Sequence, residues 1–278
     1  MPKKTNPETI LTQKQIASIP GAEPSAKIDA WWGLVIAVMA LVAALCIISP
    51  DPFLRMIIFM RNGIVTTILV TISSFFLILI AGLFGALARL SKNRFLRGFS
   101  TVYVEVMRGI PLMVQLLWWY FAFPALIRGI GDSLGVSFLS NYSANALIMA
   151  IIGLTICYGA YMTEIYRAGI QSIPRGQMEA ARSLGMTYIQ AMRYIIFPQA
   201  FRVIIPPVGN EFTALLKDTS LVSVVVVADM TRRSREFIST NFNPISGWTF
   251  LALVYLILTL LSARVASWVE QKFSQNQR

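Results

Sequence analysis

Long apolar runs with few or no charged residues alternate with polar segments along this chain. A helix needs roughly 20 apolar residues to cross about 30 Å of hydrocarbon. Six runs approach or exceed that length, and we place them at about 31–48, 62–88, 99–127, 144–163, 203–228 and 246–267. The pattern therefore predicts an all-α integral membrane protein with about six transmembrane helices.

The third run contains two opposite charges. A charge in the bilayer core costs at least ~2.5–3.5 kcal/mol, so each one needs a partner or a function. Glu105 and Arg108 lie three residues apart and share one helix face. We predict a structural ion pair between them; the alternative is that they line a transport pathway. Gly109 and Pro111 follow and predict a kink in this helix.

The fifth run is polar near its middle. Pro206–Pro207 remove two backbone donors, so a continuous helix is not expected there. Irregular backbone at membrane depth is tolerated where it is buried in protein or lines a cavity. Both charge signs and several hydroxyls would suit the carboxylate and ammonium of a zwitterion, or would form an internal network that holds helices together. The candidate pathway residues are Asn210, Glu211, Thr213, Lys217, Asp218, Thr219 and Ser220.

Composition excludes several kinds of site. Charged residues make up 13% of the chain, against about 25% in a soluble domain. Histidine is absent, and both cysteines lie inside apolar runs, so neither His-based catalysis nor a disulfide framework is indicated. No P-loop sequence occurs, so we expect this chain to bind no cofactor or metal, and any ATP and Mg to be held by another subunit.

The net charge of +11 predicts orientation rather than nucleic-acid binding. Taking alternate connecting segments, sixteen basic residues fall on the side of the N-terminal tail, six on the other side and two within spans. The positive-inside rule makes the first side cytoplasmic, so both termini are predicted to be cytoplasmic. Residues 1–30 form a polar N-terminal tail without the features of a cleaved signal peptide.

The connection between the fourth and fifth runs is unusually long. Residues 164–202 are rich in arginine, and within them 175–185 reads as a short helix that ends at a glycine. Glu164 and Arg167, at its start, are predicted to form an ion pair. Small alanines on the helix favour docking into a protein cleft over lying on the bilayer surface.

This loop resembles the EAA motif of ATP-binding cassette (ABC) importer permeases. Glu-Ala-Ala is followed after three residues by Gly, and nine residues later by Ile-x-x-Pro, with Phe197 where the family has Leu. The resemblance implies a coupling helix that docks on an ATPase subunit. The implied coupling residues are Glu179, Ala180, Ala181, Arg182, Gly185, Ile195 and Pro198.

Three further stretches resemble the polar amino acid permeases within that family. They are residues 108–115, 161–170 and 209–221, with Ala168 where Gly is usual. The resemblance implies the type I importer permease fold over 62–278, preceded by an extra helix and outer loop at 31–61.

The resemblance also implies a function. The expected protein is a permease subunit that brings polar amino acids through the bacterial inner membrane, without enzymatic activity of its own. Its expected partners are an ABC ATPase dimer, a second or homologous permease, a substrate-binding protein and membrane lipid. The alternatives are an ion-coupled secondary transporter, whose duplicated halves are not visible here, and a gated channel.

Overall fold

The computed structural model describes residues 30–274, and all regular structure within that range is helical. This confirms the predicted all-α fold. The predicted N-terminal tail lies outside the described range except for its last residue. The principal helices are α2 (Ala30–Ile48), α3 (Pro50–Leu90), α4 (Arg94–Gly109), α5 (Leu112–Leu117), α6 (Phe123–Leu134), α7 (Ser137–Ser140), α8 (Ala146–Gln171), α9 (Arg175–Ser183), α10 (Tyr188–Ala191), α11 (Phe197–Asp218), α12 (Met230–Asn241) and α13 (Pro244–Ser274).

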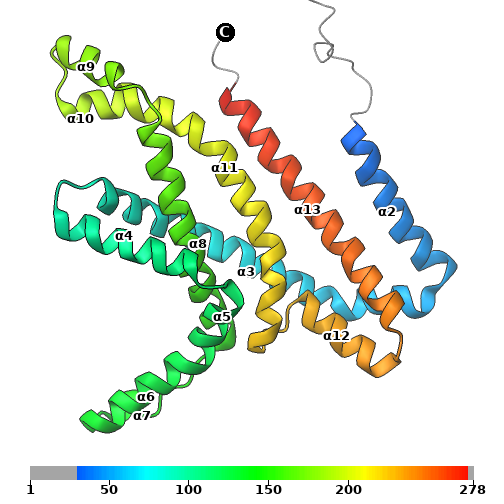
Figure 1. Cartoon of the computed structure of the whole chain (residues 1–278). Helices are drawn as coiled ribbons and strands as arrows, with labels where there is room; N and C mark the ends of the chain where they lie inside the picture. Colours follow the sequence, from blue (N-terminus) through cyan, green and yellow to red (C-terminus); the bar gives the residue numbers. More distant parts are fainter. Residues whose placement is uncertain (1–29, 275–278) are drawn as a thin grey trace, which may run out of the picture.

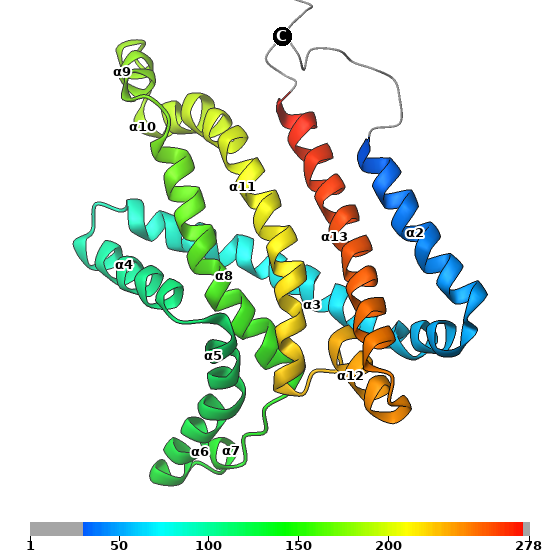
Figure 2. The ribbon, with the colours of Figure 1, turned by 45° about the vertical axis from the view of Figure 1, so that its right-hand side comes forward.

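Five helical segments are long and apolar enough to cross a membrane. They are residues 31–48, 50–90, 112–134, 146–171 and 244–273. The fifth predicted span corresponds to α11, whose prolines and charged residues make it less apolar. In two views α11 runs between α8 and α13 along the length of both (Figures 1 and 2).

Helix α3 is longer than its predicted span. It has 41 residues with a kink at the non-helical Asp51, is about 58 Å long from Pro52 to Leu90 at 1.5 Å per residue, and runs obliquely across α8, α11 and α13 (Figure 1). Residues 50–61, expected to be an outer loop, form its first turns. The charges that suggested a loop are compatible with a helix, because Asp51 and Arg55 form an exposed salt bridge of 3.0 Å while Met56 and Met60 are buried.

The third predicted span is broken, as Gly109 and Pro111 indicated. Helix α4 ends at Gly109, Ile110 is extended, and α5 begins after Pro111. The side chain of Gln115 stabilises the break, because its Nε2 donates to the carbonyls of Met107 and Ile110 at 2.8 Å each. A π-helical turn, η1 (Trp118–Ala122), then joins α5 to α6.

The prediction of an interrupted helix at Pro206–Pro207 is wrong. Helix α11 continues through both prolines and ends only at Asp218, where the 3₁₀ segment η3 (Thr219–Val225) begins. Tertiary packing supports the helix where two hydrogen bonds are lost. Ile204 is buried against Gly169 of α8, and Gly209 lets Ala266 of α13 approach closely.

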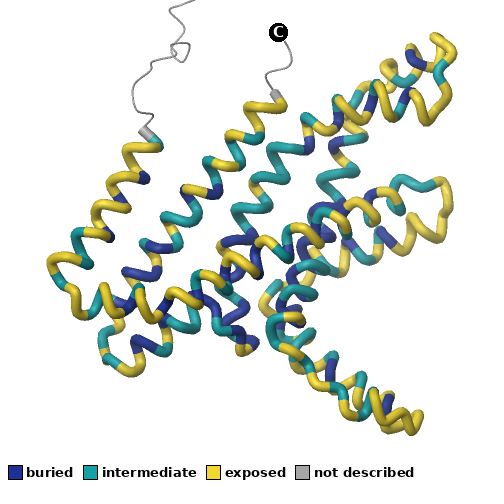
Figure 3. The backbone as a smooth tube through the Cα atoms, turned by 180° about the vertical axis from the view of Figure 1, so that it is seen from behind, coloured by how far each residue is buried: buried dark blue, intermediate teal, exposed yellow. Residues whose placement is uncertain are grey.

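Two apolar cores hold the helices together. One core joins α3, α5, α8, α11 and η3, and the other joins α2, α3, α12 and α13. Gly82 and Gly85 of α3 leave no room for a Cβ atom beside Met162 and Thr163, so α3 and α8 pack at close range. The outward faces of the long helices are mostly exposed and apolar, as lipid contact requires (Figure 3).

The two ends of the molecule differ. The start of α2, the end of α13 and the α9–α10 hairpin lie at one end, whereas α6, α7 and α12 lie at the other (Figures 1 and 2). The termini of the described chain are therefore on the same side as the long loop, in the arrangement that an even number of crossings produces.

Candidate functional site

The long loop between α8 and α11 forms a compact hairpin of two short helices that projects beyond the other helices (Figure 1). Pro174 precedes α9, and the helix ends at Ser183, two residues before Gly185, which has a φ of +82°. The N–H of Gly185 donates to Arg182 O at 3.0 Å, and the N–H of Met186 donates to Ala181 O at 3.2 Å. Glycine suits this left-handed position because it has no Cβ.

The second helix of the hairpin begins with a capping box. Gln190 N donates to Thr187 Oγ1 at 3.3 Å, and Thr187 N donates to Gln190 Oε1 at 2.8 Å. The spacing Thr-x-x-Gln is a readable helix-start signal that the sequence analysis missed. A π-helical turn, η2 (Met192–Ile196), then connects α10 to α11, so the hairpin is continuous with that long helix.

The predicted coupling residues fall on different sides of this hairpin. Ala181 is buried inside it, and Ile195 is half-buried in η2. The remaining five are exposed: Glu179, Ala180, Arg182, Gly185 and Pro198. The motif thus supplies both the packing of the hairpin and part of its outer surface.

Three large apolar side chains at the hairpin tip are also exposed. Leu184 is 82% exposed, Ile189 76% and Tyr188 58%. Tyr188 and Ile189 were not singled out from the sequence, although they lie three and four residues after Gly185. Clustered apolar side chains on a projecting segment are typical of a protein-binding surface.

A second group of functional residues lies where α4, α8 and α11 meet. The Tyr158 hydroxyl donates to Asp218 Oδ2 at 2.7 Å. Glu211 lies two helical turns before Asp218 on α11, within electrostatic range of Asp218 and Arg108. The guanidinium carbon of Arg108 lies 5.2 Å from the ring centroid of Tyr161. Two acids, one cation and two phenols therefore lie in one region. Because the two tyrosines are uncharged, the charge pattern of the sequence did not indicate them.

The other predicted pathway residues do not join this group. Thr213 and Thr219 donate their hydroxyls to backbone carbonyls of their own segment, Gly209 O at 3.2 Å and Leu216 O at 2.6 Å. Ser220 is half-buried, while Asn210 and Lys217 are exposed. Lys217 makes no salt bridge with any residue between 30 and 274, so it takes no part in an internal ion-pair network of the kind considered above.

The predicted Glu105–Arg108 pair is corrected by the structure. Glu105 is 3.8 Å from Arg89, because α4 returns alongside the end of α3, and Arg108 turns instead to Tyr161. The predicted Glu164–Arg167 pair is confirmed, with Arg167 Nε 3.0 Å from Glu164 Oε2. Arg89 also lies 3.7 Å from Glu164, so this ionic cluster connects α3, α4 and α8.

No group of three or more acidic, His or Cys side chains within residues 30–274 is arranged to hold a metal ion. What the geometry does provide is a set of long apolar helices, a partly buried charged group carried by α4, α8 and α11, and a projecting hairpin continuous with α11. These features define a multi-spanning membrane transport subunit.

Comparison with known proteins identifies the family. Residues 78–275 match the sequence model described as "Binding-protein-dependent transport system inner membrane component", and the chain belongs to that family. It is 38% identical to the L-cystine transport system permease protein TcyB of Bacillus subtilis (strain 168), over 78% of this chain and 87% of the relative. It is 32% identical to the glutamate/aspartate import permease protein GltJ of Escherichia coli (strain K12), over 76% and 85% respectively.

A solved structure supports the same conclusion. The crystal structure of an amino acid ABC transporter with histidines superposes with a TM-score of 0.69 and 34% sequence identity, covering 79% of this chain and 96% of that one. The predicted class is therefore confirmed: the chain is an ABC transporter permease, a multi-pass inner membrane subunit that transports rather than catalyses.

Proposed function

We propose that this permease moves polar amino acids into the cytoplasm, driven by ATP hydrolysis on a separate subunit. The observation that carries the proposal is the continuity of hairpin and helix. From Tyr188 to Asp218 the chain is helical throughout, about 45 Å at 1.5 Å per residue. One end of this rod is the exposed hairpin and the other bears Asp218, so a displacement of the hairpin is transmitted to the charged group.

The hairpin has the surface expected for docking on a soluble ATPase. Exposed apolar side chains, Leu184, Tyr188 and Ile189, lie beside the charged Glu179 and Arg182. Such a surface fits a groove with an apolar floor and a polar rim. ATP and Mg would be bound by the ATPase dimer, and this chain would contribute only the moving element.

The charged group among α4, α8 and α11 matches the chemistry of an amino acid. Arg108 suits a carboxylate, whereas Glu211 and Asp218 suit an ammonium group. The relatives' names refer to cystine and to glutamate and aspartate, all of them polar amino acids. We therefore assign polar amino acids as the substrate class and the surroundings of Asp218 as part of the pathway.

Orientation follows from charge. The hairpin end carries the larger share of basic residues, so we place it and both termini in the cytoplasm. The opposite end, with α6, α7 and α12, would then receive the substrate-binding protein. A second permease, identical or homologous, would complete the pathway.

The test is uptake of a polar amino acid by the complete transporter in proteoliposomes. We expect Gly185→Arg to assemble but to lose ATP-driven uptake, since the substitution strains a left-handed position and blocks the hairpin surface. Gly98→Arg is the matched control, because Gly98 is exposed on α4 with open space around it. Normal ATP-driven uptake by Gly185→Arg contradicts the coupling role. Uptake driven by an ion gradient without ATP would favour a secondary transporter instead.

A further inference from the structure

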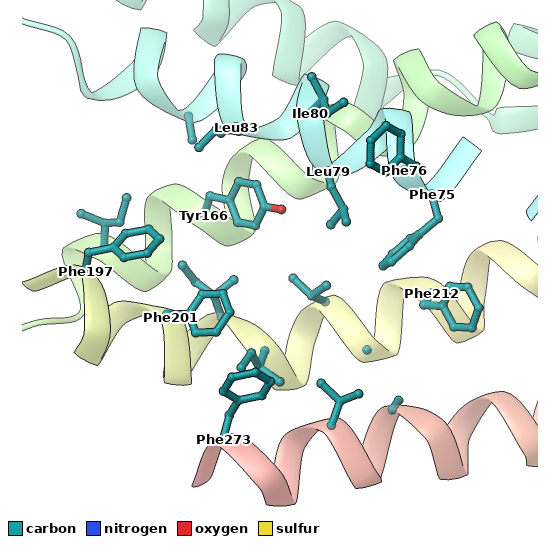
Figure 4. Close-up of a pocket in the computed structure, with 18 of the residues that line it drawn as sticks. Phe75, Phe76, Leu79, Ile80, Leu83, Tyr166, Phe197, Phe201, Phe212 and Phe273 are labelled. Carbon is teal, nitrogen blue, oxygen red and sulfur yellow. The ribbon is translucent and has the colours of Figure 1, made fainter. Parts of the chain in front are cut away.

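An apolar groove of about 610 Å³ runs along α11, between α3 and α8 on one side and α13 on the other. Phenylalanines line it at intervals, among them Phe75, Phe201, Phe212 and Phe273 (Figure 4). The groove is open at the surface, so it is accessible from the lipid phase. It is separate from the charged group around Asp218.

One polar atom faces into this groove. The hydroxyl of Tyr166, on α8, points toward the space between α3 and α11 (Figure 4). It has no hydrogen-bond partner in the described part of the chain, and every other described residue that lines the groove is apolar. A hydroxyl without a partner in an apolar groove gains a hydrogen bond when a ligand brings an acceptor into the groove.

Two basic residues lie one helical turn from lining residues at the hairpin end of the groove. Phe201 and Phe273 meet there with ring centroids 5.4 Å apart. Arg202 lies one turn before Ile205, and Lys272 lies one turn after Val269, both of which line the groove. Neither cation forms a salt bridge with a residue that the structure describes, and the Lys272 ammonium lies 5.1 Å from the ring centroid of Trp268.

We propose that the groove binds one acyl chain of an anionic phospholipid from the cytoplasmic leaflet. The phosphate lies between Arg202 and Lys272, and the Tyr166 hydroxyl donates to an ester carbonyl. Basic residues at the cytoplasmic ends of membrane helices are suited to such headgroups.

A lipid chain in the groove is expected to affect transport. The groove lies beside the contacts of α11 with α3 and α8, such as Phe75 with Phe212, so a chain lodged in it affects how α11 moves against α3. We therefore expect anionic lipid to alter the rate of coupled transport. Assignment of the cations to the cytoplasmic leaflet rests on the orientation proposed above, but lipid binding itself can be measured without transport.

The test is native mass spectrometry of the complete transporter, purified from vesicles of dioleoyl phosphatidylglycerol and dioleoyl phosphatidylcholine in equal amounts. We expect the phosphatidylglycerol to be retained in preference. The double variant Arg202→Gln/Lys272→Gln should bind it roughly 30-fold more weakly, because two attractions to the phosphate are lost. Val265→Trp, at an exposed position in the groove, should displace the acyl chain. Lys92→Gln is the control, an exposed cation at the α3–α4 turn.

Three results overturn the proposal. They are equal retention of the two lipids, retention of phosphatidylglycerol unchanged in both groove variants, and an equal loss in the Lys92→Gln control. A fourth is a disulfide-linked dimer of Val265→Cys chains formed in the bilayer, which would show that a second copy fills the groove. The charge variant and the filling variant act independently, so a failure of either to fold leaves the other to decide.

Discussion

The Tyr158 hydroxyl and the Asp218 carboxylate form a 2.7 Å hydrogen bond that ties the middle of α8 to the last residue of α11. Because this carboxylate is partly buried, removing its donor leaves a charge with less stabilisation. Hydrogen bonds to charged groups contribute about 1.5–3 kcal/mol. The bond therefore holds the charged group and the two helices in one arrangement.

Tyr158→Phe should lower the rate of ATP-driven uptake at least tenfold, with a smaller effect on thermal stability, since the ring remains in its packing site. Uptake and thermal unfolding of the purified transporter measure the two effects. Tyr194→Phe is the matched control, because Tyr194 is 61% exposed and makes no hydrogen bond with the described residues. Equal uptake by the two variants would show that the Asp218 contact has no part in transport.

Gly82→Ala should destabilise the chain by about 1–3 kcal/mol, the usual cost of overpacking a tight contact. A Cβ at this position would overlap the side chain of Met162 on α8. Gly33→Ala on α2, where nothing lies within 4 Å, should be neutral or slightly stabilising. Denaturation monitored by circular dichroism in detergent compares the two, and similar midpoints would refute the close α3–α8 packing.

Asp229 provides a third prediction, at the start of α12. Its carboxylate accepts from Arg232 N at 2.9 Å and from Thr231 N at 3.1 Å, which makes it the N-cap of that helix. Asp229→Ala should cost about 0.5–2 kcal/mol, whereas Asp229→Asn retains an acceptor and should cost less. Thermal unfolding measures both, and an Asn variant as unstable as the Ala variant would exclude capping as the main role.

Glu164→Gln should destabilise the chain more than Glu236→Gln. Glu164 pairs with Arg167 and lies near Arg89, whose Nη1 is buried without a hydrogen bond among the described residues. Loss of this carboxylate should cost about 1.5–3 kcal/mol. Glu236 pairs with Arg232 and Arg233 at a more exposed site, where an ion pair contributes about 0.2–1 kcal/mol. Unfolding at low and high salt should separate the variants, and the reverse order would contradict this assignment.

The features set by local sequence were predictable. Apolar runs located the long helices, because hydrocarbon requires them, and Gly109 with Pro111 located the break after α4. The Glu164–Arg167 pair followed from spacing on one helix. Gly185 marked the end of α9 because few other residues adopt its conformation. The family motif placed the hairpin in the chain but did not show that Ala181 faces inward.

The features that depend on neighbouring helices were not predictable. Pro206–Pro207 lie within a continuous helix because α8 and α13 pack around it, which no local rule indicates. Glu105 pairs with Arg89 only because α4 folds back along α3. Tyr158 and its partner are sixty positions apart in the chain. A single sequence contains no signal for such contacts.

Helix α3 contributes Val70 and Ile78 to one core and Met56 and Met60 to the other. The stretch from Val222 to Met230 also passes from the first core to the second, but it is not one continuous helix. Helix α3 therefore couples the two cores, so that a change in its tilt displaces both halves of the subunit together. The permease is consequently expected to switch between its conformations as a whole, with few stable states in which only one half has moved.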